Sequence, residues 1–288
     1  MIWESNMNFT LKMTAASAAL LLALGLSGCT EKAPQTASSG ENAAAASDAL
    51  SAIRAKGQIT IAMEGTWAPW TFHDASGTLT GYDVAVGRGI AKAIGVEPVF
   101  VEGKWDGLLA GISAGRYDLM VNGVDVTPER ADAFRFSEPY AYNRMAVIVQ
   151  DDRSDIQTMA DLKGKHTANT ISSTYAIAAE KAGARVTGVD DLNQTFELLL
   201  SGRIDATLNS EVTFYDYKRA HPEAKVKIAF LAPEATAVAI PMKKDASTET
   251  LAAAVNDAIR AMRESGELAR ASTEFFGADI SKMSEEKH

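Results

Sequence analysis

One short run of the sequence combines a carboxylate with a guanidinium. In Asn122-Gly123-Val124-Asp125-Val126-Thr127-Pro128-Glu129-Arg130, Asp125 precedes Arg130 by five residues. A guanidinium presents a planar fork that fits a carboxylate, and it stays charged at ordinary pH. A desolvated ammonium group needs a carboxylate or several acceptors. Such a run suits the recognition of a zwitterion; the alternative is a surface ion pair of Arg130 with Glu129 or Asp132.

The histidines and glycines form no catalytic or metal-binding pattern. The four histidines have no metal-ligand spacing; they are His73, His166, His221 and His288. No G-x-S-x-G elbow and no glycine-rich phosphate loop occurs, and Gly87-Arg88-Gly89 lies inside a helical pattern. We therefore expect no enzyme activity, no metal and no cofactor.

The composition fits a soluble globular protein that does not bind nucleic acid. The 288 residues are enough for two lobes with separate cores, and the hydrophobic fraction of 47% is ordinary. The formal net charge of −9 lacks the excess of Lys and Arg that a phosphate backbone requires.

The N-terminus has the pattern of an export signal. Lys12 precedes an apolar stretch over residues 15–26, which is too short for a comfortable bilayer span. The stretch ends in Leu26-Ser27-Gly28-Cys29, which resembles a bacterial lipobox. We predict a lipoprotein signal peptide over 1–28, lipidation at Cys29 and a flexible tether over 29–47, with Met1 or Met7 as the start. The alternative is an ordinary signal peptide with a chance cysteine.

A first series of elements follows the tether. Strands are predicted at 58–63, 98–101 and 118–121. Asp83 is predicted to cap one helix, which ends at Gly95, and Asp106 to cap a second, which ends at Gly115. This β-α-β-α-β order indicates an open, mostly parallel sheet.

A second series has a similar build. Strands are predicted at 146–149, 166–170, 185–189, 204–208, 225–229 and 237–240, and helices at 174–182, 192–200, 213–220, 251–263 and 267–276. Both series share the spacing Gly-Arg-x-Asp-x-x-x-Asn, which ends at Asn122 in the first and at Asn209 in the second. Ligands bind beyond the carboxyl ends of strands in open α/β sheets, so two such edges facing each other would form a cleft.

Five sequence runs, in this order, resemble those of a known family: Glu64-Gly65-Thr66-Trp67-Ala68-Pro69-Trp70, Gly81-Tyr82-Asp83, Trp105-Asp106-Gly107, the run from Asn122 to Arg130, and Phe136-Ser137-Glu138-Pro139-Tyr140. From about Gln58 to Phe276 the chain resembles the periplasmic binding proteins of polar-amino-acid ABC transporters, solute-binding protein family 3.

The resemblance implies an α/β periplasmic-binding-protein type II fold. It has two α/β lobes joined by two hinge strands, near 140–144 and 232–236, with the ligand in the cleft. The first lobe would take 48–143 and 236–280 and the second 144–235, leaving a polar tail at 281–288.

The resemblance also assigns binding residues. Arg130 aligns with the arginine that binds the ligand carboxylate, and Trp67 and Trp105 align with aromatic walls of the site. The second lobe would offer hydroxyls and backbone N–H groups around the start of a helix. The remaining binding residues implied in this way are Asn122, Gly123, Thr170, Ser173, Thr174, Asn209 and Ser210.

Two departures from the family pattern concern the ligand's α-ammonium group. Asp125 stands where many members have Ser or Thr, and Ser210 stands where many have an Asp near this group. We therefore expect Asp125 to hold the α-ammonium, with Glu211 as a second candidate.

The side-chain wall shows no obvious charge once Arg130 and Asp125 are assigned, which favours an uncharged polar amino acid. Thr167-Ala168-Asn169-Thr170 and Thr207-Leu208-Asn209-Ser210-Glu211 look similar to the cystine- and cysteine-binding branch; the alternative is glutamine or another neutral polar amino acid.

The implied protein is a monomer in the periplasm or on the outer face of the cell membrane. It would be held by its lipid anchor alone and would serve a separate permease and its ATPase. The rival hypotheses are a periplasmic dehydratase acting on prephenate or arogenate, with Glu211 as the acid, and the sensor domain of a receptor.

Overall fold

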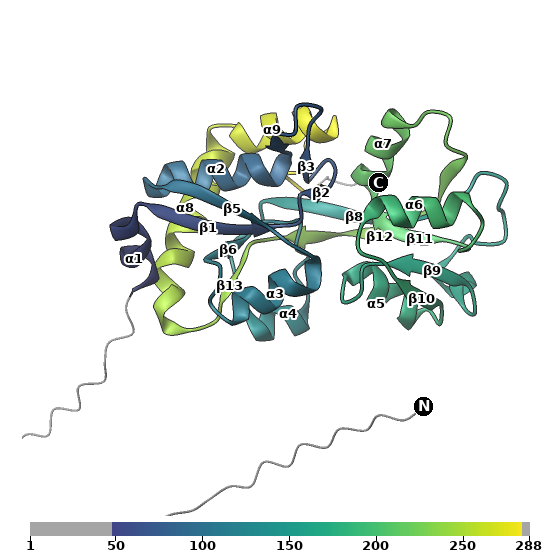
Figure 1. The fold of residues 1–288 in the computed structure, drawn as a ribbon, viewed down its shortest axis with the longest axis horizontal. Coiled ribbons are helices and arrows are strands. Elements are labelled where there is room, and N and C mark those ends of the chain that lie inside the picture. Colours follow the sequence, from purple (N-terminus) through teal and green to yellow (C-terminus); the bar gives the residue numbers. More distant parts are fainter. Residues whose placement is uncertain (1–47, 284–288) are drawn as a thin grey trace, which may run out of the picture. The chain divides into compact units, whose positions relative to one another are not determined.

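The computed structural model describes residues 48–283 (Figure 1). The predicted signal peptide, the lipidation site at Cys29 and the tether up to residue 47 lie outside the described residues. Within 48–283, every helix is too short or too polar to cross a membrane.

The first series of strands and helices is confirmed, but its predicted N-caps are wrong: Gly81 and Lys104 hold those positions, and Asp83 and Asp106 lie in the first turns of the helices. Strand β1 (Gln58–Met63) lies at the centre of a parallel sheet, between β5 (Glu97–Glu102) and β6 (Leu119–Met120). The other elements of this half are α1 (Ala49–Lys56), β2 (Thr66–Trp67), β3 (Thr71–His73), β4 (Leu79–Thr80), α2 (Tyr82–Ile94), α3 (Trp105–Ser113), α4 (Pro128–Ala133) and β7 (Phe134–Phe136). Parallel pairing brings the carboxyl ends of β1 and β6 to one edge, where Glu64 and Asn122 follow them.

The second series is mixed rather than uniformly parallel. Strand β9 (His166–Asn169) pairs in parallel with β10 (Arg185–Gly188), but β8 (Ala141–Gln150) pairs antiparallel with β11 (Thr207–Ser210) and β12 (Val226–Val238). The intervening elements are η1 (Met159–Leu162), α5 (Thr174–Lys181), α6 (Leu192–Leu200) and α7 (Glu211–Ala220), and the chain closes with β13 (Pro241–Lys243), η2 (Ala246–Thr248), α8 (Glu249–Glu264) and α9 (Glu267–Phe276).

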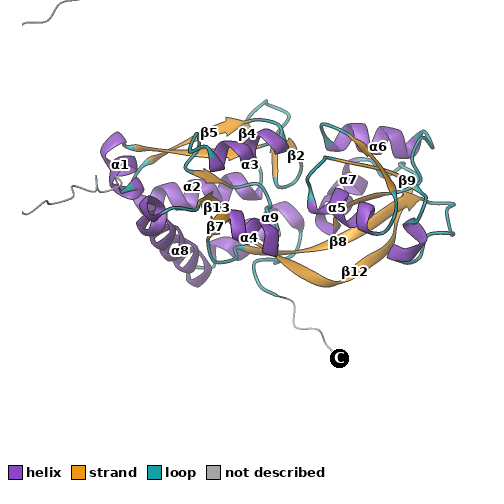
Figure 2. Cartoon of the chain, turned by 90° about the horizontal axis from the view of Figure 1, so that it is seen from below, coloured by secondary structure: helices purple, strands orange, loops and turns teal. Residues whose placement is uncertain are grey.

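The prediction of two separate strands around Pro233 is wrong. Strand β12 is continuous from Val226 to Val238 and follows β8 along its length (Figure 2). Proline lacks the N–H that a sheet ladder uses, and the pairing register shifts between Leu231 and Ala235. This irregularity accommodates Pro233 without ending the strand.

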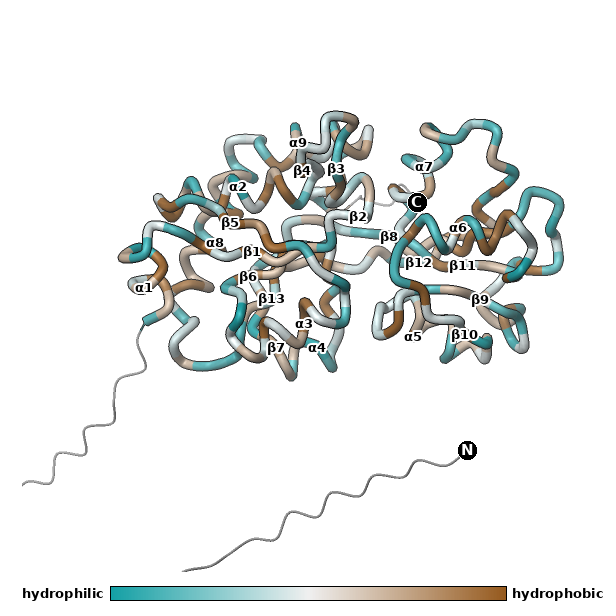
Figure 3. The backbone as a smooth tube through the Cα atoms, in the orientation of Figure 1, coloured by the Kyte–Doolittle hydropathy of each residue, from teal (hydrophilic) through white to brown (hydrophobic). Residues whose placement is uncertain are grey.

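The hydrophobic core is divided between the two halves. One cluster joins β1, α2, α8 and α9, and includes Ile61, Ile90 and Val255. Two further clusters are built almost wholly from residues 145–231. Figure 3 shows hydrophobic stretches on the central strands and mixed colouring along the covering helices. Trp67 packs against a cluster on each side, which places its ring where the two halves meet.

Candidate functional site

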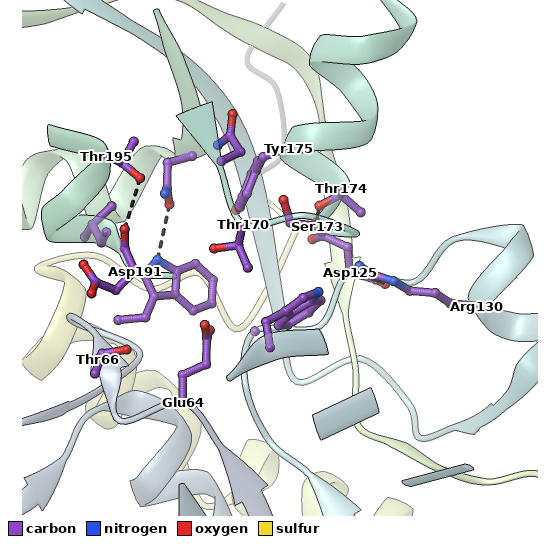
Figure 4. Close-up of a pocket in the computed structure, with 16 residues that line it drawn as sticks. Glu64, Thr66, Asp125, Arg130, Thr170, Ser173, Thr174, Tyr175, Asp191 and Thr195 are labelled. Atoms are coloured by element: carbon purple, nitrogen blue, oxygen red, sulfur yellow. Dashed lines mark hydrogen bonds between the residues drawn. The ribbon is translucent and has the colours of Figure 1, made fainter. Parts of the chain in front are cut away.

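A pocket of about 600 Å³, part of it open to solvent, lies between the two halves (Figure 4). Residues that precede β8 line one side: Glu64, Thr66, Trp67, Trp105, Gly123, Asp125 and Arg130. Residues between β8 and β12 line the other: Asn169, Thr170, Ser173, Thr174, Tyr175, Asp191, Leu192, Thr195 and Asn209. The lining residues lie on or just after β1, β9 and β11 and in the neighbouring loops and helix starts, as the sheet-edge argument predicts.

Arg130 is fixed by the short helix α4. Thr127 caps this helix by accepting the Arg130 backbone N–H at 3.2 Å, and Pro128 occupies its first turn. The side chain is 8% exposed, and its guanidinium lies 5.1 Å from the centre of the Trp105 ring. Its Nη1 donates to the Asp125 carbonyl at 3.1 Å and its Nη2 to the Ser172 carbonyl at 3.2 Å. Because a guanidinium has five N–H donors, donors remain for a ligand.

Asp125 is a buried carboxylate with one unused oxygen. It is 5% exposed, and its Oδ2 accepts the Thr174 hydroxyl at 2.5 Å. Its Oδ1 makes no hydrogen bond within residues 48–283. Burial raises the pKa of Asp125 to about 6, although Thr174, Arg130 and Asn143 act to lower it. A buried acceptor at a pocket wall needs a donor, and an ammonium group supplies one.

The far side of the pocket carries neutral donors at the start of α5. Ser173 caps this helix, with its Oγ accepting the Ala176 N–H at 3.1 Å. The helix begins at Thr174 and presents free N–H groups that favour an anion. Asn209 reaches across the pocket, where its Oδ1 accepts the Trp67 indole N–H at 3.3 Å. Thr170 also lines the pocket.

Three predicted residues lie outside the pocket lining: Asn122, Ser210 and Glu211. The Asn122 side chain accepts the Glu64 N–H and donates to Glu64 Oε2, both at 2.7 Å, so it supports a lining residue instead. Ser210 is fully buried and donates to Asn143 at 2.5 Å. Glu211 forms an ion pair with Arg144 at 2.9 Å. The positions of Ser210 and Glu211 therefore give no support to direct ligand contact, and that of Glu211 gives none to a role as acid.

The expectation that no charge remains in the side-chain wall is wrong. Glu64 and Asp191 also line the pocket, and Figure 4 shows Asp191 on the side away from Asp125 and Arg130. The pKa of Glu64 is raised to about 7, mainly by burial and to a smaller extent by Asp106 and Asp191, while the Asn122 hydrogen bond acts to lower it. Asp191 caps α6 by accepting the Gln194 N–H at 3.0 Å.

Sequence reasoning could have found Glu64, because it follows the carboxyl end of β1 as Asn122 follows β6. The other lining residues that it missed are Thr66, Asn169, Tyr175, Asp191, Leu192 and Thr195. Tyr175 and Thr195 lie within helices, where no sequence signal separated a pocket position from a core position.

Comparisons with known proteins agree with this geometry. The model of bacterial extracellular solute-binding proteins, family 3, matches residues 59–278. The L-cystine-binding protein TcyA of Bacillus subtilis is 36% identical over 82% of this chain and 87% of the relative. The solved L-cystine solute receptor of Neisseria gonorrhoeae, unliganded and open, is 38% identical over 82% of this chain and 100% of its own, with a TM-score of 0.56. The solved structure of an ancestral arginine-binding protein bound to arginine is 29% identical; the match covers 77% of this chain and 99% of that protein, with a TM-score of 0.72.

The ligand-free protein should become less stable as the pH rises. Burial raises the pKa of Asp83 to about 8, and those of Glu64 and Asp125 to about 7 and about 6. These carboxyls hold their protons more tightly in the folded protein than in the unfolded chain. Their stabilising contribution is therefore complete below about pH 4 and is lost as the pH rises through 6 to 8. We expect the free energy of unfolding, measured by urea denaturation, to fall by roughly 1 kcal/mol or more from pH 5 to pH 8.

Two variants test the contribution of Asp125. Asp125→Asn should remove the part of this slope that lies below about pH 6 and leave the part due to Glu64 and Asp83, whereas Glu234→Gln, which removes an exposed carboxylate, should retain all of it. A stability that rises with pH over this range would contradict the assignment.

Proposed function

The chain belongs to the bacterial extracellular solute-binding proteins of family 3, and we propose that it captures a free polar amino acid for an ABC importer, with cystine as the favoured ligand. Members of this family work outside the cytoplasm, and the import partners would be a membrane permease and its ATPase. The proposal includes a monomer anchored by lipid at Cys29.

The pairing of opposite charges in the pocket carries this proposal. The ligand's α-carboxylate would bind Arg130 and the N–H groups at the start of α5. Its α-ammonium would bind the unused Oδ1 of Asp125. The two charges lie next to each other because the Arg130 guanidinium donates to the Asp125 backbone. A free α-amino acid offers its two backbone charges at a matching short separation.

Cystine also suits the far end of the pocket. Glu64 and Asp191 add two carboxylates there, while Arg130 is the cation among the described lining residues. Asp191, together with Glu64 once a nearby ammonium group favours its ionised form, makes this end of the pocket negative and favours a ligand with a second ammonium group. Cystine has one, whereas cysteine and glutamine do not. The hydroxyls of Thr66 and Thr195 and the Asn169 amide lie in the same lining and are candidate donors to its second carboxylate. The names of the L-cystine-binding relatives point the same way.

Capture would proceed by closure of two lobes, 48–143 with 236–280 and 144–235, about β8 and β12. Several hydrogen bonds already cross the cleft: Thr174 to Asp125, Arg130 to the Ser172 carbonyl, Trp67 to Asn209, and Ser172 to Asp106. An ion pair between Lys104 and Asp190, 2.6 Å apart, also joins the two sides. The higher TM-score with an arginine-bound relative than with an open receptor supports a closed arrangement.

Calorimetry of the mature, unlipidated chain tests the ligand. We expect L-cystine to bind with one-to-one stoichiometry and at least about tenfold more tightly than glutamine or cysteine, because only cystine supplies the second ammonium. In Glu64→Gln this preference should shrink, with glutamine binding little changed. The absence of binding to any amino acid would refute the proposed function, and a preference for glutamine would refute the ligand.

Replacing Asp125 tests the α-ammonium site. Asp125→Asn leaves a ligand ammonium without its charged partner, and we expect a loss of about 30-fold or more in affinity for every amino acid that binds. Glu211→Gln is the matched control, because Glu211 pairs with Arg144 outside the lining and its loss should leave affinity unchanged. If Glu211→Gln lost affinity and Asp125→Asn did not, Glu211 would be the residue that binds the α-ammonium.

A further inference from the structure

A buried polar pair lies behind the pocket, in the aromatic part of the core. The Tyr140 hydroxyl donates to Asp83 Oδ1 at 2.6 Å, and both residues are 0% exposed. Asp83 belongs to the first turn of α2, and Tyr140 directly precedes β8. Asp83 Oδ2 makes no hydrogen bond with the residues that the structure describes. A buried carboxyl group is costly, so its position here calls for an explanation.

The same hydroxyl reaches the wall of the pocket. Tyr140 Oη accepts the backbone N–H of Gly123 at 3.2 Å. Gly123 lines the pocket two residues before Asp125 and has a φ of 54°, in the left-handed region. A Cβ at this position would lie 2.5 Å from the Trp67 ring. The Gly123 peptide is therefore held between Tyr140 on the core side and Trp67 on the pocket side.

The backbone of Tyr140 joins this loop to the connecting strands. Its N–H donates to the Val238 carbonyl at 2.9 Å, at the end of β12. Val238 in turn forms a β-bridge with Asp125. On either side of that bridge, Ala239 donates to the Val124 carbonyl and Val126 donates to the Ala237 carbonyl. Tyr140 is thus the point at which the loop of Gly123 and Asp125 meets both β8 and β12.

We propose that Asp83 and Tyr140 are positioning residues for the Asp125 site. Asp83 orients the Tyr140 hydroxyl, whose lone pair then fixes the Gly123 peptide, and the loop presents the Asp125 carboxylate to the ligand. Without the hydroxyl, the Gly123 N–H would lose its acceptor at 3.2 Å and keep only a weaker interaction with the Asp83 carboxylate, so the loop would be held less firmly. This inference rests on the proposed function, because it takes Asp125 to be the ligand contact.

Tyr140→Phe tests the proposal, because it removes the hydroxyl and keeps the ring. We expect ligand affinity to fall about tenfold, as for the loss of one hydrogen bond. Hydrogen exchange at the Gly123 amide, followed by NMR in the full chain, should accelerate. The matched control is Tyr82→Phe: Tyr82 is equally buried, and its hydroxyl donates to the Tyr140 carbonyl at 2.9 Å without reaching the loop.

Tyr82→Phe should therefore lower stability while leaving both affinity and Gly123 exchange as in the wild type. If Tyr140→Phe changes these two readouts no more than Tyr82→Phe does, the pair is only part of the core and the inference fails. Gly123 exchange needs no ligand, so it decides this inference even if the wild-type protein binds no amino acid.

A double-mutant cycle tests the order of action. If Asp83 acts through Tyr140, Asp83→Ala should weaken binding by itself but add little in the Tyr140→Phe background. Effects on affinity that multiply would show that the two residues act separately and would overturn the proposed chain from Asp83 to Gly123.

Discussion

Asp125 holds a carboxylate oxygen inside the protein with no donor from the described residues, and much of the surrounding structure can be understood from this constraint. Desolvation penalises the charge, and the raised pKa reports that penalty. Arg130 and the Thr174 hydroxyl offset part of it. A ligand ammonium would offset the rest. Because a neutral group would leave the desolvated carboxylate uncompensated, burial of Asp125 favours a ligand with a cationic group. Asp125 stays buried because its loop is held in place: Asp125 forms a β-bridge with Val238 of β12, and the Gly123 N–H donates to the Tyr140 hydroxyl.

Contacts across the cleft have a second consequence. Thr174 donates directly to Asp125, and Arg130 donates directly to the Ser172 carbonyl, so two groups proposed to bind the ligand also bind the opposite side of the cleft. The closed arrangement therefore has favourable contacts of its own. A ligand shifts the balance between open and closed forms only by its differential affinity for them. In the proposed mechanism, the ligand must add contacts to Asp125 and Arg130 without losing these hydrogen bonds.

The parts of this structure that follow local rules could be predicted from the sequence. The order of strands and helices up to Val121 follows from their periodicity and from the glycines that end the helices, and the run from Asn122 to Arg130 follows from the family resemblance. Side-chain direction could not be predicted in the same way. Asn122, Ser210 and Glu211 have plausible chemistry at plausible positions, but their partners, Glu64, Asn143 and Arg144, are distant in sequence. The continuity of β12 could not be predicted from the sequence either. A proline such as Pro233 normally indicates the end of a strand, and the register shift that accommodates it here is visible only in the structure.

Glu64 shows how the proposed ligand changes when the fold is known. From sequence alone, Arg130 and Asp125 exhaust the evident charges, and an uncharged side chain fits best. In the folded protein, the Asn122 amide donates a hydrogen bond to the Glu64 carboxylate, which lines the pocket. Asp191, at the start of α6, adds a further carboxylate to the same pocket. Arg130 and Asp125 both precede β8, so the ligand's proposed α-groups can bind one side of an open cleft. Asp191 belongs to the opposite side. A second ammonium group on the ligand would therefore contact both Glu64 and Asp191 only after closure. In the proposed mechanism, recognition of that second ammonium thus depends on the closing step.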